Sequence, residues 1–199
     1  MTGKTHLVMG EAAALAVMQP VGWQEVAWCL GAAAIGAVIC DIDIDSSNAH
    51  KKVEAAVIIC TVAVILLGLA EWKFQLGITQ EMIQRRDIWP KIAGGAGLFI
   101  LCIFGKEQPH RSFMHSLLAV CLFSGLVYLI LPEAAGYFAV AMSSHLVLDI
   151  FNKKDIRLWY PFSGGVSLKL CRADGAVNQI LFYVGCAAAG ILTVIGLMR

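Results

Sequence analysis

Residues 108–116 read Gln-Pro-His-Arg-Ser-Phe-Met-His-Ser and place two imidazoles and a guanidinium where an apolar segment begins. Pro109 suits the first position of a helix, because its fixed φ is helical and its missing N–H would have no partner there. The stretch therefore predicts a helix that starts at Pro109. On such a helix His115 lies one turn beyond Arg111, whereas His110 and His115 lie about 140° apart around the axis. His110 would have to turn inward from the helix end to join the other two side chains.

The composition of the chain decides its class. Of the 199 residues, 59% are hydrophobic and only 15% are charged, and the mean hydropathy is +0.75. Soluble domains are far more polar. We therefore expect an all-α, polytopic transmembrane helix bundle that forms a single membrane-embedded domain over residues 1–199. A net charge of +1 without a basic stripe argues against nucleic acid as a partner, and the seven cysteines form no C-x-x-C pair.

About six to seven apolar segments are expected to be helical, namely residues 7–19, 25–40, 53–70, 92–104, 117–131, 134–151 and 176–198. Segment 53–70 has about the length that spans a bilayer, whereas segment 92–104 must be extended by flanking residues, tilted or shielded. Residues 71–91 have the aromatic and basic composition of an interfacial segment. Glu11 favours a bundle helix over a signal peptide for the first segment, because a carboxylate is costly in lipid.

Three carboxylates at a spacing of two residues, Asp41, Asp43 and Asp45, follow segment 25–40 directly. Two of them converge whether the stretch is extended or helical. A solvated acidic loop is one interpretation, but crowded like charges are unfavourable without a cation. The motif therefore favours metal binding. A further imidazole, His6, stands just before the first apolar segment.

A second acidic motif ends the sixth apolar segment. His145 and Asp149 are i,i+4 neighbours, and Asn152 lies on the same helical face. This spacing is typical of two metal ligands, or of a carboxylate that orients an imidazole beside a metal. A buried hydrogen bond that only joins two helices is the structural alternative.

Alternating crossings would bring all of these motifs to the same side of the membrane. If each segment spans, the side reached after segment 25–40 receives His6, the three aspartates, the 108–116 stretch and Asp149. That side also holds ten of the fifteen Lys and Arg residues. The positive-inside rule therefore predicts that it is cytoplasmic.

With these motifs in order, the chain resembles the bacterial family of inner-membrane-associated, metal-dependent hydrolases of the YdjM type, also described as LexA-binding. The residues that match the family's motifs are Gly3 and His6, Asp41 and Asp43, His110, Arg111, His115 and Ser116, and Ser144, His145 and Asp149. The chain also departs from the family's motifs at four positions. Cys40 replaces a Pro, Met114 replaces a Thr and Asn152 replaces the usual Thr. Asn178 stands where the family often has a Glu. The resemblance implies a multi-pass protein of the bacterial inner membrane.

The leading hypothesis is a membrane-embedded hydrolase with a divalent metal ion. The expected metal ligands are His6, Asp41, Asp43, His115, His145 and Asp149. Mixed imidazole and carboxylate ligands suit zinc best, with manganese or iron as alternatives. The expected catalytic residues are Asp43 as general base, Arg111 as the group that grips a phosphate, and His110 beside them.

The expected substrate is a phosphate-containing lipid or lipid-linked molecule, with membrane lipids as partners and the oligomeric state open. A metal or proton transporter is one alternative, although transport sites tend to lie near the bilayer midplane rather than at one edge. A non-catalytic membrane scaffold that binds structural metal is another. Metal-free lipid phosphatases do not fit, because Ala139 stands where their Arg is required.

Overall fold

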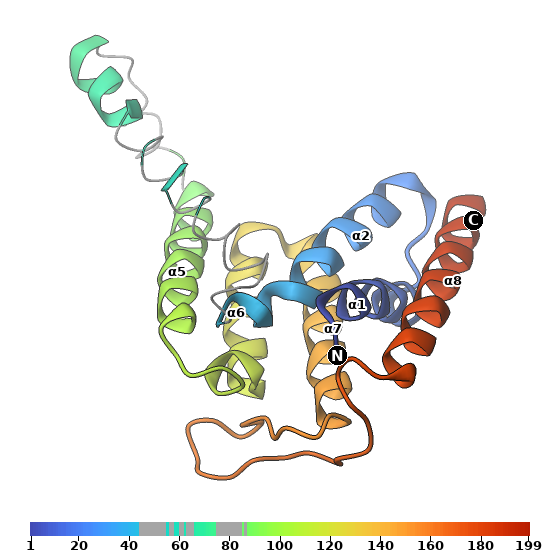
Figure 1. Cartoon of the computed structure of the whole chain (residues 1–199). Helices are drawn as coiled ribbons and strands as arrows, with labels where there is room; N and C mark the ends of the chain where they lie inside the picture. Colours follow the sequence, from blue (N-terminus) through green and yellow to red (C-terminus); the bar gives the residue numbers. More distant parts are fainter. Residues whose placement is uncertain (44–54, 56–57, 60–61, 63–65, 75–84, 86) are drawn as a thin grey trace.

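Six helices with defined bounds in the computed structural model coincide with six of the seven predicted segments (Figure 1). They are α1 (Gly3–Met18), α2 (Gly22–Ile39), α5 (Ile88–Lys106), α6 (Leu117–Ile130), α7 (Pro132–Ile150) and α8 (Ala176–Met198). The structure describes residues 1–43, 55, 58–59, 62, 66–74, 85 and 87–199. Predictions for segment 53–70, for much of 71–91 and for Asp45 lie largely or wholly outside them. No strand is present in the described part of the chain, and the all-α class is confirmed.

Among the described residues, three helical stretches are long and apolar enough to cross a membrane: Gly22–Asp43, Ile88–Lys106 and Ala176–Met198. The short segment 92–104 is extended at both ends by its flanking residues, as expected. α6 is apolar but has only 14 residues, fewer than the roughly 20 that a helix needs to span a bilayer. These helices make the chain a membrane protein.

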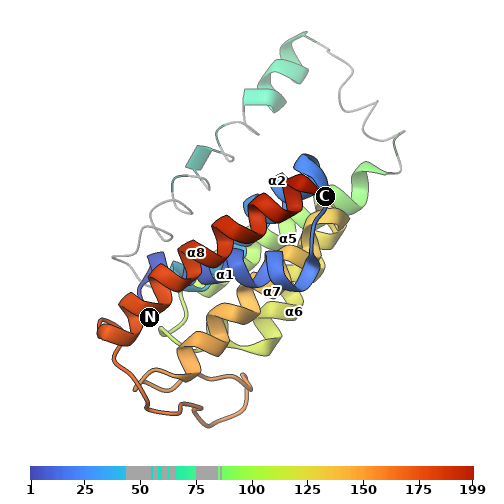
Figure 2. The same cartoon turned by 90° about the vertical axis from the view of Figure 1, so that its right-hand side faces the viewer.

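The central helix of the bundle is α7, which packs against α1, α2 and α6. α8 covers α1, and α5 packs on α6 at the other edge of the bundle (Figures 1 and 2). Buried residues occur along most of α7, from Ala134 to Asp149. The position of α7 therefore carries the His145/Asp149 motif into the interior.

Small residues let the central helices approach closely. A Cβ added at Gly10 on α1 would lie 2.5 Å from the Cβ of Ala37 on α2. One added at Gly36 would lie 2.5 Å from the carbonyl oxygen of Phe138 on α7. Glycine and alanine at such contacts allow the close backbone packing that holds helices together in a membrane.

The predicted helix start at Pro109 is wrong. α5 ends at Lys106, residues 107–112 form a turn, and a short 3-10 helix, η2 (Phe113–His115), follows. Arg111 has a φ of +68°, a left-handed backbone conformation that no right-handed helix contains. The stretch is therefore a turn, and helical angles do not describe its side chains.

The true start of α6 is set by Ser116. Its side chain accepts a hydrogen bond of 3.1 Å from the backbone N–H of Ala119, which is the N-cap arrangement. The same hydroxyl donates to the Phe113 carbonyl oxygen at 2.6 Å. His110 and His115 thus lie before the helix, with their ring centroids 5.2 Å apart and their planes nearly perpendicular.

We expect Gly36→Leu to lower the free energy of unfolding by about 1–3 kcal/mol, because the new side chain would push α2 away from α7. Gly31→Leu on the same helix is the matched control, since a Cβ there meets no described atom within 4 Å. Thermal denaturation of both purified variants in detergent measures the difference. Equal melting temperatures would contradict the close approach of the two helices.

Candidate metal centre

The structure brings all eight predicted site residues into one cluster. It forms where α1 and α7 meet the turn before α6 and a short 3-10 helix, η1 (Cys40–Asp43), that follows α2. The members are His6, Asp41, Asp43, His110, Arg111, His115, His145 and Asp149, and each has a described contact with another member. These residues are far apart in the sequence, and they come together because α2 and α6 both pack against α7.

Asp149 is the hub of this cluster, and its side chain is almost fully buried. Its Oδ1 lies 3.3 Å from His6 Nε2. Its Oδ2 lies 3.4 Å from both His115 Nε2 and Nη2 of Arg111. Asn152 donates a hydrogen bond of 2.6 Å to Oδ1, so it lies beside Asp149 as predicted, but it does so from beyond the end of α7 at Ile150 and not from a shared helical face. One carboxylate thereby connects α1, η2 and the turn to α7.

The rings of His6 and His145 stack almost in parallel, with centroids 3.7 Å apart. His145 Nδ1 lies 2.7 Å from the Ala37 carbonyl oxygen, which can only accept, so Nδ1 carries the proton. Nε2 of His145 therefore has a free lone pair, and it lies 3.7 Å from Asp41 and 3.9 Å from Asp149. Fixing the tautomer through the second nitrogen is a common feature of metal-binding histidines.

Asp43 has different surroundings. Its Oδ1 lies 2.8 Å from His110 Nδ1, and its Oδ2 accepts a 3.1 Å hydrogen bond from the Arg111 backbone N–H. His115 Nδ1 is 3.5 Å from Oδ2. The His110 side chain is 37% exposed whereas that of Asp43 is fully buried. Asp43 therefore orients two imidazoles, and its roles as metal ligand and general base stay predictions.

His115 is completely buried between two carboxylates. Its two ring nitrogens make no hydrogen bond within the described residues, although each lies near a carboxylate oxygen. Burial alone lowers the pKa of His115, but Asp149 and Asp43 outweigh that effect and raise the pKa to about 9. A cation bound between these carboxylates competes with the proton on the ring.

The spacing of the polar atoms fits a bound metal ion. Zinc holds N and O ligands at about 2.0–2.2 Å, which places tetrahedral ligand atoms about 3.3–3.6 Å apart. The contacts of Asp149 with the imidazoles of His6, His115 and His145, at 3.3–3.9 Å, are near this range and too long for good hydrogen bonds. In the described part of the chain, three overlapping ligand groups can hold an ion: His6/His145/Asp149, Asp41/His115/His145 and Asp43/His110/His115.

Unpartnered buried atoms support the same interpretation. Seven buried side-chain N or O atoms lack a hydrogen-bond partner among the described residues, and five of them are imidazole nitrogens of this cluster or the amide oxygen of Asn152 beside it, atoms that can face a cation. Such atoms are rare in folded proteins and call for an ion or another explanation. The donor set, its spacing and these free atoms all fit a divalent cation.

Arg111 joins the cluster to the loop after α7. Its Nη1 donates to the Lys154 carbonyl oxygen at 2.6 Å, while Nη2 faces Asp149. The Arg157 backbone N–H donates to the Arg111 carbonyl oxygen at 2.9 Å. The guanidinium therefore neutralises a buried carboxylate, and its role in gripping a phosphate stays a prediction.

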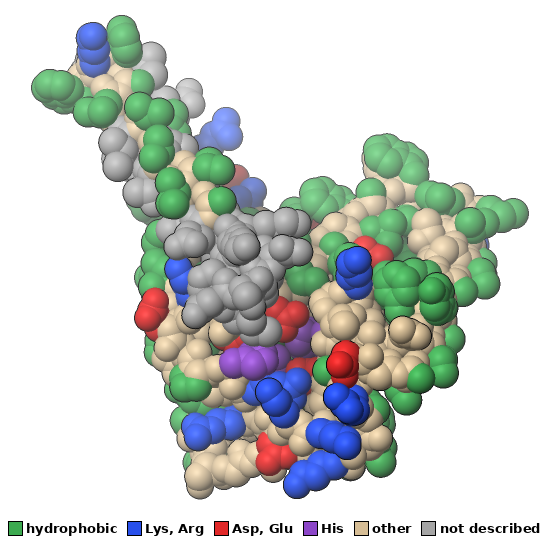
Figure 3. All heavy atoms as spheres, viewed as in Figure 1, with side chains coloured by type: hydrophobic (Ala, Val, Ile, Leu, Met, Phe, Trp, Pro, Cys, Tyr) green, Lys and Arg blue, Asp and Glu red, His purple; other side chains and the backbone are tan. Residues whose placement is uncertain are grey.

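A polar cavity of about 420 Å³ lies beside the cluster. Its walls are the turn before α6 and the loop after α7, specifically Pro109, His110, Arg111, Ser112, Asp155, Ile156, Arg157, Gly164 and Gly165. A Cβ at Gly165 would lie 2.6 Å from that of Asp155, so glycine lets the loop fold back on itself. On this face, Lys and Arg side chains gather next to the exposed histidine surface (Figure 3).

Two contacts that position the histidines escape sequence reasoning. The Ala37 carbonyl is a backbone group and leaves no side-chain signal. Asn178, at the family's Glu position, accepts a 3.0 Å hydrogen bond from the Thr2 backbone N–H, and its carbonyl oxygen accepts from the Thr5 hydroxyl at 3.5 Å. Asn178 thus holds the first turn of α1, which carries His6.

Fold and cluster together define an all-α membrane protein with a buried His/Asp site suited to a metal ion. A model of the YdjM inner membrane protein family matches residues 1–198, and the chain belongs to this family. The predicted resemblance to the YdjM family is thereby confirmed, whereas the hydrolase activity and LexA binding that it implied stay predictions. The chain is also similar to the uncharacterized protein YvsG of Bacillus subtilis (strain 168), with 27% identity over 193 residues that cover 95% of this chain and 91% of the relative. No solved structure matches it significantly.

We expect protein purified without chelator to contain a divalent metal ion and His145→Ala to lose most of it, because the Nε2 lone pair points at two carboxylates. Ser144→Ala is the matched control, since the Ser144 hydroxyl donates only to the Ala141 carbonyl of its own helix, at 2.8 Å. Elemental analysis of the three proteins measures the metal. Equally low content in all of them would contradict the site.

Proposed function

We propose that this protein is a membrane-bound hydrolase that uses a divalent metal ion to cleave a phosphate-containing lipid or lipid-linked molecule at the membrane surface. One observation carries the proposal: four imidazoles and three carboxylates converge beside a polar cavity that two arginines line. The mixed nitrogen and oxygen donors favour zinc, with manganese or iron as alternatives. Such an ion, when bound, polarises a phosphoryl oxygen and lowers the pKa of a bound water.

The exposed histidine is placed to move a proton. Asp43 accepts the Nδ1–H of His110 at 2.8 Å, which leaves Nε2 as the basic nitrogen of that ring. Because His110 lines the polar cavity, Nε2 can take a proton from an attacking water and return it to a leaving oxygen. Asp43 acts in this scheme by holding the tautomer, as a carboxylate does in a catalytic triad.

Arg157 is suited to bind the substrate phosphate. It lines the same cavity and is exposed, and its guanidinium has no described ion pair or hydrogen bond. Arg111, by contrast, has both terminal nitrogens engaged by Lys154 and Asp149. A guanidinium with free donors matches the geometry of a phosphate. We assign recognition to Arg157 and charge balance to Arg111.

The position of the cluster supports an enzyme over a transporter. Asp41 follows the end of α2, and His115 lies just before α6, so these ligands stand at helix ends. Transport sites usually lie at broken helices near the bilayer midplane. A cluster at helix ends that adjoins a polar cavity is better placed to receive a headgroup.

Hydrolysis of anionic phospholipid vesicles should stop with chelator and return with zinc. Arg157→Ala should lower kcat/KM by about 10–100-fold, because a charged hydrogen bond contributes about 1.5–3 kcal/mol, and should keep its metal. Lys169→Gln is the control, since this exposed residue of the same loop does not line the cavity. Chelator-resistant turnover, or metal-loaded protein that hydrolyses no phospholipid tested, would refute the proposal.

We also propose that the site faces the cytoplasm, as the charge bias predicts. Ser163→Cys in the exposed loop after α7 should react with an impermeant maleimide only in inverted vesicles. Lys73→Cys should react only in intact spheroplasts. Both variants need the exposed native thiols Cys121 and Cys186 replaced. Labelling of both positions from one side would show that the topology is wrong.

A further inference from the structure

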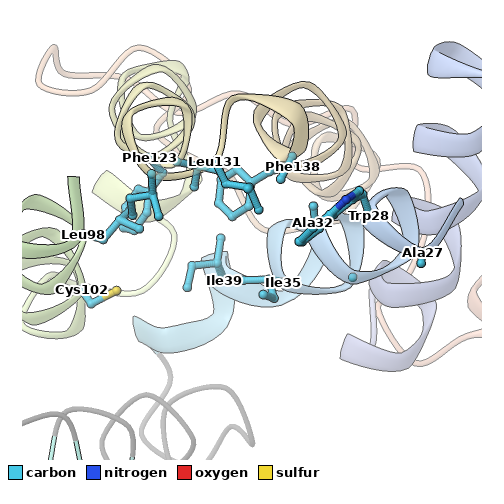
Figure 4. A pocket seen from close by; sticks show the side chains of 14 residues that line it. Ala27, Trp28, Ala32, Ile35, Ile39, Leu98, Cys102, Phe123, Leu131 and Phe138 are labelled. Carbon is cyan, nitrogen blue, oxygen red and sulfur yellow. The ribbon is translucent and has the colours of Figure 1, made fainter. Parts of the chain in front are cut away.

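A second cavity, of about 430 Å³, lies between α2 and α5 and is almost entirely apolar (Figure 4). α2 contributes Ile35 and Ile39, α5 contributes Leu98 and Cys102, and Phe123 of α6 lies between them. α2 packs on α7 while α5 packs on α6, so a space remains between α2 and α5. We refer to it as the apolar groove.

The groove opens between two helices that are long and apolar enough to cross the membrane. Ile35 is 59% exposed and Trp28 is 48% exposed along it. The polar side-chain atoms of its lining are limited to the indole nitrogen of Trp28 and the sulfur of Cys102. In a bilayer the groove therefore faces hydrocarbon. A polar ligand that entered it would lose its hydration without gaining a polar partner.

The Ile39 end of the groove is the end nearer the candidate metal site. Ile39 lines the groove and stands two residues before Asp41. Ile39 and Cys102 pack against the same buried cluster as Cys40 and Met114, and Met114 precedes His115. The groove and the predicted ligands therefore border the same part of the buried core.

The dimensions of the groove match a single hydrocarbon chain. Its wall runs along α2 from Ala27 to Ile39, which is about 18 Å at 1.5 Å per residue. A volume of about 430 Å³ over this length gives a mean cross-section of about 24 Å² for the centre of a water molecule, and adding the water radius of about 1.4 Å on each side makes the groove about 8 Å wide. A helix with side chains is about 10–12 Å wide and does not fit. A chain one carbon atom thick, about 4 Å across its contact surface, does fit.

We propose that the apolar groove holds one acyl or prenyl chain of the substrate while the phosphate headgroup occupies the polar cavity at Arg157. This inference rests on the proposed function and specifies its substrate class. A polar cavity lined by two arginines and an apolar groove that ends two residues before Asp41 lie near the same ligand cluster, so together they fit an anionic amphiphile. A short, water-soluble phosphoester would leave the groove without a ligand.

The first experiment closes the groove at a glycine. Gly31 lines it, and a Cβ there meets no described atom within 4 Å, so Gly31→Trp fills space without displacing a helix. Excluding even two methylenes corresponds to about a tenfold loss. The ratio of long-chain to short-chain turnover should therefore fall at least about tenfold, with metal content retained. Gly190→Trp, at an equally open position on α8, should keep the wild-type ratio. A wild-type ratio in Gly31→Trp would overturn the proposal.

The second experiment does not depend on hydrolysis, so it separates failure of this inference from failure of the proposed function. Vesicles containing phosphatidylglycerol with a diazirine at mid-chain are irradiated, and labelled peptides are mapped by mass spectrometry. Label should concentrate on groove residues of α2 and α5, and it should fall in Gly31→Trp but not in Gly190→Trp. Label spread evenly over the lipid-facing helices, or absent from the groove because a second copy or another helix covers it, would overturn the assignment.

Discussion

The rest of this structure depends on the interactions that stabilise the buried carboxylate of Asp149. An isolated charge in a protein interior costs several kcal/mol, so it must be surrounded by positive or hydrogen-bonding partners. His6, His115, Arg111 and Asn152 supply them from four different parts of the chain. The start of α1, the turn before α6 and the loop after α7 therefore take their places from one electrostatic requirement. The apolar helices create this requirement, because their packing buries Asp149.

The turn before α6 shows how this requirement overrides local preference. Pro109 followed by an apolar run favours a helix, yet Arg111 adopts a left-handed backbone. In return its N–H donates to Asp43, its carbonyl oxygen accepts from Arg157, and its guanidinium reaches Asp149. A helix through these residues would commit the same backbone groups to its own hydrogen bonds. The strained backbone of Arg111 therefore allows two buried carboxylates, those of Asp43 and Asp149, to have hydrogen-bonding or charged partners.

The two cavities give the metal centre an asymmetric setting. One is polar and bounded by loops that carry His110 and Arg157. The other is apolar and bounded by helices suited to the membrane interior. A polar cavity near an apolar groove resembles the boundary of a bilayer itself, where headgroups meet chains. The family membership is consistent with this setting, because it places the chain in an inner membrane.

The sequence by itself determined the helices, because a chain this apolar can satisfy its backbone in lipid only by forming them. It also predicted the eight residues that the structure brings together, and the i,i+4 approach of His145 and Asp149, since that approach depends only on helical periodicity. Only the tertiary structure decided that residues 107–112 form a turn, that Ala37 sets the His145 tautomer, and that Arg111 pairs with Asp149 while Arg157 makes no ion pair with the described residues. These facts depend on contacts between residues as much as 108 positions apart, and no local pattern encodes which distant partner will satisfy a buried polar group.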